Sequence, residues 1–170
     1  MLLSLAEWVQ NLGFFSDLRG SAYEYPILLA LHLSFISLFG AMIVVTDLRL
    51  LGWAFTDWPI SDLVDRLRVP KRIGFVLAAT CGFLLFCSKA EEYYYNAFFR
   101  VKISLFILVA VHAIVFRSGV YNRAKELDGA APVPVRAKWA ARLSLLLWTG
   151  ILCAGRGIGY LPGTAGLHFN

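Results

Sequence analysis

Four long apolar segments, separated by charged connections, dominate the sequence. They cover about residues 26–47, 72–89, 97–117 and 139–160. An α-helix needs roughly 20 predominantly apolar residues to cross the hydrocarbon core of a bilayer, and these segments have about that length. We therefore predict an all-α integral membrane protein, a four-helix transmembrane bundle in which residues 1–170 form a single transmembrane domain.

The composition favours lipid as the solvent of this chain. Hydrophobic residues make up 59% of the sequence and charged residues 16%, whereas soluble domains have about 45–50% and roughly 25%. The net charge of +5 is concentrated in basic residues beside the apolar segments. That pattern is typical of membrane orientation rather than nucleic-acid binding. The expected partner is the lipid bilayer, and nucleic acid is excluded as a partner.

The segment at residues 2–16 is too polar to span a membrane, but it has helical periodicity. Apolar side chains recur at Leu5, Trp8, Val9 and Leu12, which is the spacing of one helix face. We predict an amphipathic helix lying in the membrane interface. The first residues lack a basic start, so we expect no cleavable signal peptide.

The orientation follows from the distribution of lysine and arginine. Eleven of the sixteen basic residues lie near the connections between the first and second spans and between the third and fourth, and five lie on the other side. Cytoplasmic loops carry the excess of basic residues. We therefore place both termini on the periplasmic side of a bacterial inner membrane.

Polar residues within the spans are the candidates for chemistry, because each costs free energy to insert into lipid. Two histidines, His32 and His112, suggest haem iron, which imidazoles on facing helices can ligate from both sides. At 1.5 Å per residue, His32 lies roughly 8 Å and His112 roughly 22 Å below the outer surface. This difference in depth argues against one haem shared by both rings.

Each histidine belongs instead to its own layer. In the outer layer, His32 is level with Lys102 and near Arg100, so it could bind haem b with its propionates on the basic side chains, or a quinone head group. In the inner layer, His112 is level with Met42, and His/Met ligation of haem iron is known chemistry. The alternative for either histidine is an interhelical hydrogen bond that stabilises the bundle.

Asp47 and Arg49 mark the inner end of the first span. They are two residues apart and do not face each other on one helix. We expect Asp47 to pair with another element, for example Arg72 or Arg142. Arg49 could instead bind a lipid phosphate.

The chain resembles an uncharacterised family of small four-span bacterial inner-membrane proteins. The matching stretches are residues 25–26 (YP), 31–32 (LH), 47–52 (DLRLLG), 82–86 (GFLLF) and 98–102 (FFRVK). The family has no assigned function, so the resemblance implies an architecture rather than an activity.

The leading functional hypothesis is a membrane-embedded accessory or anchoring subunit of a larger, redox-linked inner-membrane complex, associating with other membrane subunits or with itself. A b-type haem electron-transfer protein or a quinol-interacting protein is the alternative. A small transporter is less favoured, because no Asp or Glu lies in the middle of a span. The sequence has no strong catalytic motif, which disfavours an enzyme.

Overall fold

The described part of the chain is all-helical. The computed structural model describes residues 1–128, 130 and 132–160, and no strand occurs among them. The helices are α1 (Leu2–Gln10), α2 (Gly13–Gly20), α3 (Glu24–Leu51), α4 (Ile60–Ser88), α5 (Ala90–Tyr95), α6 (Ala97–Arg117), the short 3-10 helix η1 (Tyr121–Arg123), α7 (Ala124–Asp128) and α8 (Val135–Ile158).

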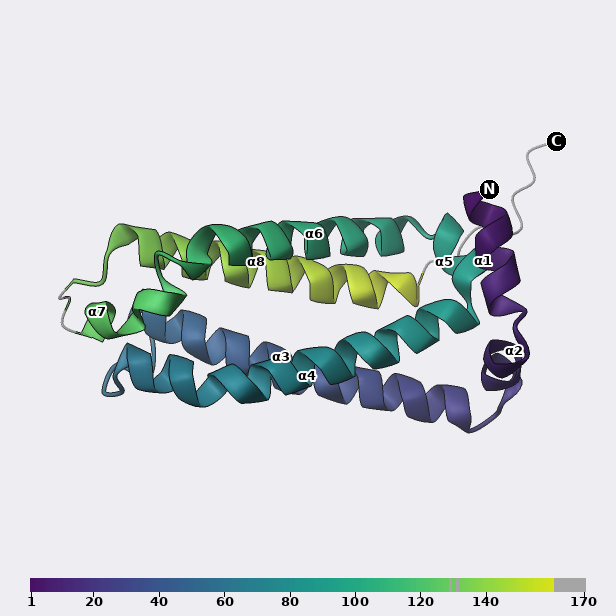
Figure 1. Ribbon diagram of the computed structural model, residues 1–170, viewed down its shortest axis with the longest axis horizontal. Helices are drawn as coiled ribbons and strands as arrows, with labels where there is room; N and C mark the ends of the chain where they lie inside the picture. Colours follow the sequence, from purple (N-terminus) through teal and green to yellow (C-terminus); the bar gives the residue numbers. More distant parts are fainter. Residues whose placement is uncertain (129, 131, 161–170) are drawn as a thin grey trace.

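The four long helices form two antiparallel pairs (Figure 1). Helix α3 packs on α4, α6 packs on α8, and contact between α3 and α8 joins the pairs. The short helices α1, α2 and α5 lie at one end of the bundle, while η1 and α7 lie at the other (Figure 1). We call these the α1 end and the α7 end.

Three helical stretches, at Glu24–Leu51, Ile60–Ser88 and Ala97–Asp128, are long and apolar enough to cross a membrane. At 1.5 Å per residue, the 28 residues of the first extend about 42 Å, which exceeds the hydrocarbon core. Few of their most apolar residues are buried inside the protein. The faces that they expose are therefore suited to lipid, and the stretches indicate a multi-pass membrane protein.

Helix α4 begins earlier than the apolar run at 72–89 predicts. It starts at Ile60 and continues through Pro70, so the charged residues immediately before the run are helical. Two features account for this. Asp128 of α7 accepts hydrogen bonds from the backbone N–H and the hydroxyl of Ser61, which caps the first turn. Pro70 has no backbone N–H and so removes one hydrogen bond from the helix. Pro70 is exposed, so this loss falls on the outer side of the helix, which tolerates it.

The N-terminal segment also differs from the single helix expected at 2–16. It forms two helices, α1 and α2, that lie across the α1 end of the bundle (Figure 1). The amide of Gln10 donates to the Glu91 carboxylate at 2.7 Å, and the Glu91 N–H donates back to Gln10 Oε1 at 3.1 Å. Arg19 donates to the carbonyl of Ser88 at 3.1 Å. These bonds hold both helices against the ends of α4 and α5.

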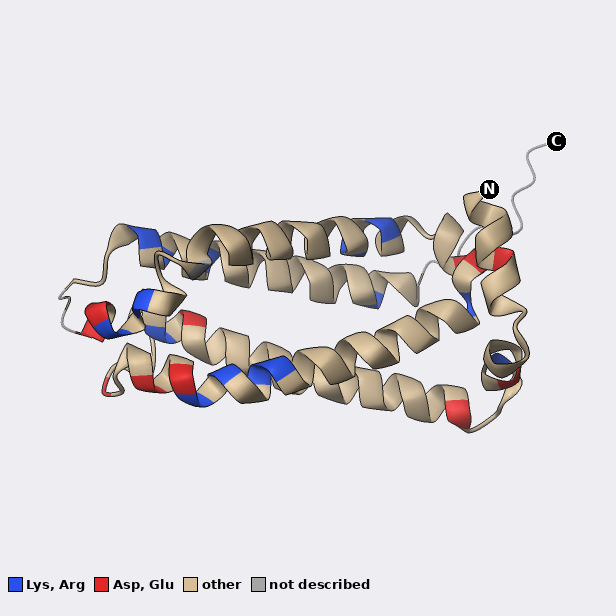
Figure 2. Cartoon of the chain, viewed as in Figure 1, with Lys and Arg blue, Asp and Glu red and all other residues tan. Residues whose placement is uncertain are grey.

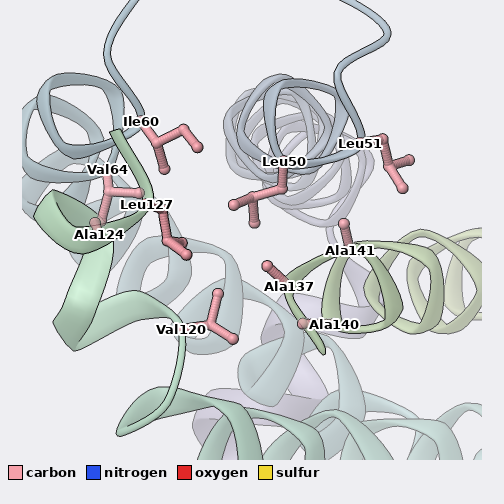
Figure 3. Close-up of a cluster of buried hydrophobic side chains, with 10 residues drawn as sticks. All are labelled: Leu50, Leu51, Ile60, Val64, Val120, Ala124, Leu127, Ala137, Ala140 and Ala141. Carbon is pink, nitrogen blue, oxygen red and sulfur yellow. The ribbon is translucent and has the colours of Figure 1, made fainter. Parts of the chain in front are cut away.

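The largest buried core lies at the α7 end (Figure 3). It joins α3, α4, α7 and α8 through the side chains of Leu50, Leu51, Ile60, Val64, Val120, Ala124, Leu127, Ala137, Ala140 and Ala141. The three of these alanines that belong to α8, at positions 137, 140 and 141, let this helix approach its neighbours closely, as small residues do between membrane helices. A smaller cluster of Phe39, Trp148 and Ile151 lies nearer the middle.

Candidate functional site

His32 of α3 points at α4, and its ring is fixed in orientation. Nδ1 lies 2.9 Å from the backbone carbonyl oxygen of Ala78. A carbonyl only accepts hydrogen bonds, so Nδ1 must carry the proton and donate it. Nε2 forms no hydrogen bond with any described residue, so the neutral imidazole has its lone pair there. With its lone pair on Nε2, a histidine can bind a metal ion or accept a hydrogen bond through that atom.

Gly82 makes room for the His32 ring. A Cβ atom built at this position would lie 2.7 Å from His32 Cε1 and 3.3 Å from Nδ1. Real Cβ atoms do not approach other atoms so closely, so a side chain here would displace the ring. The position of His32 therefore depends on a glycine one turn beyond its hydrogen-bond acceptor, Ala78, on α4.

Lys102 of α6 shares this layer with His32. The two side chains are close enough to interact electrostatically, and Lys102 Nζ lies 3.6 Å from the Cβ position of Gly155 on α8. Both residues are half-buried. The site thus combines one free imidazole nitrogen with one ammonium group, contributed by the two different helix pairs.

Arg100, the other basic residue predicted at this layer, faces elsewhere. Its Nε and Nη2 atoms donate to the backbone carbonyl of Tyr94 at 3.2 Å and 2.9 Å. Its guanidinium also lies over the Tyr94 ring, 5.7 Å from the centroid. Arg100 therefore belongs to the surface formed by α5 and α6, outside the space between the helix pairs.

The inner pair of predicted ligands, His112 and Met42, have contacts on different helices. His112 Nε2 lies 2.9 Å from the carbonyl oxygen of Ala140 on α8, and its ring packs on Phe116 at 4.8 Å between centroids. The methyl carbon of Met42 lies 3.5 Å from the Cβ position of Gly74 on α4. Nε2 of His112 is therefore hydrogen-bonded, whereas Nε2 of His32 has no hydrogen bond to a described residue.

A second buried polar cluster lies between α3, α4 and α8, and its partners differ from those predicted for Asp47. Only 1% of Asp47 is exposed. Ser144 of α8 and Lys71 of α4 interact with it, rather than Arg72 or Arg142. Lys71 donates to Thr46 Oγ1 at 2.6 Å, and Asp47 Oδ2 forms no hydrogen bond with a described residue.

Arg49 has a protein partner, because its Nε donates to the Trp58 carbonyl at 2.6 Å. It thereby ties the end of α3 to the following loop. Among the described residues, no three His, Cys, Asp or Glu side chains come together as a metal-ion site. The histidine layer therefore offers one iron-ligating nitrogen rather than a multidentate metal cage.

The chain belongs to a protein family described as "Family of unknown function (DUF6644)", which residues 5–161 match. This bears out the resemblance to an uncharacterised family. No curated protein and no solved structure matches the chain significantly. The function must therefore be inferred from the site itself.

Proposed function

We propose that the chain crosses the membrane four times, with α8 as the fourth span. Helix α8 packs along both α3 and α6, so a membrane that contains those two helices also contains α8. Its 24 residues extend about 36 Å, which is enough to cross the hydrocarbon core. Its basic residues near the N-terminus, such as Arg136 and Arg142, lower its hydropathy without interrupting its apolar part.

The α7 end faces the cytoplasm in this proposal, and the α1 end faces the periplasm of a bacterial inner membrane. Lys and Arg residues are concentrated towards the α7 end (Figure 2). The positive-inside rule assigns such an end to the cytoplasm. Helices α1 and α2 would then lie in the outer interface, where the exposed Trp8 and Phe14 contact lipid.

Within this frame, we propose that the protein is an accessory subunit of a redox-linked membrane complex and that His32 binds the redox group. The orientation of the His32 ring carries this proposal. Nδ1 is held by the Ala78 carbonyl, Gly82 leaves space for the ring, Nε2 has no hydrogen bond to a described residue, and Lys102 is close enough to His32 to interact with it electrostatically. A histidine that served only to join α3 to α4 would need the Ala78 hydrogen bond but not the lysine.

Two ligands fit the chemistry of the free Nε2 atom. A b-type haem would receive His32 as an axial ligand, and Lys102 would pair with a propionate. A quinol would donate a hydroxyl proton to Nε2, with Lys102 stabilising the negative charge that develops on the oxygen. His32, protonated on Nδ1, has no proton on Nε2 to give to an oxidised quinone. The site therefore favours haem or the reduced form of a quinone.

The accessory role is supported by α6. This helix packs mainly on α8. In the stretch Ala97–Asp128, no residue of the most apolar continuous 18-residue segment is buried inside the protein. A span with so little cover within its own chain can contact helices of other subunits or a second copy as well as lipid.

Purification from native membranes in a mild detergent tests the accessory role and the redox ligand together. We expect one or more membrane proteins to copurify in a fixed ratio, and we expect haem b or a quinol in the organic extract. A lone monomer would contradict the accessory role. An extract that contains neither redox group would contradict the role of His32.

A further inference from the structure

An apolar groove lies at the α1 end, outside the space that holds His32. Its volume is about 460 Å³ and it is open on one side. Helix α1 forms one wall with residues such as Leu5 and Val9, and α4, α5 and α6 form the rest. The size is within the range of about 300–1,000 Å³ that is typical of small-ligand sites.

Three stacked aromatic rings form part of the groove. Phe86, Tyr93 and Phe99 come from α4, α5 and α6, and the rings of Phe86 and Phe99 are nearly parallel at 5.3 Å between centroids. Tyr93 stacks on Phe99 at 5.0 Å. Burial raises the Tyr93 pKa above its ordinary value. The phenol therefore stays neutral, and the rings present apolar surface to the groove.

Arg100 supplies the only charge among the residues that line the groove. Two of its nitrogen atoms donate to the Tyr94 carbonyl, but it forms no ion pair with a described carboxylate. The nearby acids have other partners, since Glu91 binds Gln10 and Glu92 binds Lys89. The remaining guanidinium donors suit a phosphate group.

The groove is continuous with the exposed apolar face of α6. Ile103 lines the groove and is 43% exposed, and Ile107 lies one turn further along the same helix and is 60% exposed. A hydrocarbon chain that enters the groove can therefore extend along α6 into the bilayer. An amphiphile with a long apolar tail and an anionic head matches both the apolar walls and the arginine.

We propose that this groove binds an anionic glycerophospholipid from the leaflet at the α1 end. One acyl chain lies on the Phe86, Tyr93 and Phe99 rings, and the phosphate contacts Arg100. The bound lipid fills the space between α1 and the bundle and so fixes α1 in place. This inference depends on the membrane placement of the chain and not on the role of His32.

Native mass spectrometry of the delipidated full-length chain, reloaded with defined lipids, tests the proposal. We expect one phosphatidylglycerol molecule to be retained in preference to phosphatidylethanolamine. Ala6→Trp places a large ring in the groove and should abolish retention. Ala41→Trp adds the same ring to an exposed position on α3, a helix that does not line the groove, and should leave retention unchanged.

Arg100→Gln tests the head-group contact separately. Losing a charge-assisted hydrogen bond should weaken phosphatidylglycerol binding about tenfold and remove the preference over phosphatidylethanolamine. Equal retention by the wild-type protein, Ala6→Trp and Ala41→Trp would overturn the proposal. Wild-type binding that does not distinguish the two lipids would also overturn it.

Discussion

Single residues decide how the histidine layer is built, and Gly82 is the clearest case. We expect Gly82→Ala to push the His32 ring out of place, break its bond to Ala78 and cost about 1–3 kcal/mol of unfolding free energy, as overpacking does. Thermal unfolding in detergent measures this.

Gly40→Ala is the matched control for that change. Gly40 also lies within a long helix, and a Cβ there meets nothing within 4 Å. The control should therefore be neutral or slightly stabilising. If Gly82→Ala proved as stable as Gly40→Ala, the close packing of His32 on α4 would be wrong.

A second prediction for single residues concerns the interaction between Asp47 and Lys71. Asp47→Ala removes the acidic group that interacts with Lys71, so it should cost about 0.5–3 kcal/mol of unfolding free energy. The double variant Asp47→Ala with Lys71→Met should be less destabilised than the sum of the two single variants. Urea unfolding of all four proteins gives the coupling energy. Strictly additive effects would mean that the two charges do not interact.

The partners of these residues could be predicted only in part from the sequence. The polar character of His32 and Asp47 within apolar runs marked them as candidates. Their contacts with Ala78 and Lys71 depend on the relative rotation of α3 and α4. Successive helix residues are about 100° apart, so Lys71 reaches Asp47 while its neighbour Arg72 is exposed. One sequence does not fix that rotation.

At the scale of elements, the apolar runs located the long helices, but they did not reveal where α4 begins. Its first turns are charged and precede Pro70, and they are held by Asp128, which is 67 residues away from Ser61. A local pattern cannot report such a distant cap. The apolar run at 139–160 predicts the fourth span, and the packing of α8 on α3 and α6 supports the same placement.

A prediction for a whole helix concerns Asp128, which accepts hydrogen bonds from Ser61 in the first turn of α4. Asp128→Ala should cost about 0.5–2 kcal/mol, because it leaves the first donors of α4 without their acceptor. Asp65→Ala is the control, since Asp65 forms only an exposed pair with Arg68, and such pairs contribute about 0–1 kcal/mol. Chemical unfolding would measure both variants. A larger loss for Asp65→Ala than for Asp128→Ala would contradict the capping role.

The whole molecule has its buried core at one end and its half-buried polar layer towards the other. Its membrane topology can be tested with single cysteines in a background free of Cys81, Cys87 and Cys153. We expect Tyr160→Cys to react with an impermeant maleimide in intact spheroplasts, and Lys125→Cys to react only after lysis. Reaction of both positions from the same side would show that α8 does not cross the membrane.

The molecule as a whole is proposed to hold a redox group at His32, and this is the central claim. The absorption spectrum of the purified protein, expressed with full haem supply, tests it most directly. We predict either a Soret band in the spectrum or a bound quinol in the organic extract, and we expect His32→Ala to abolish that ligand and His112→Ala to leave it intact. A wild-type protein with neither ligand, or a ligand that survives His32→Ala, would contradict it.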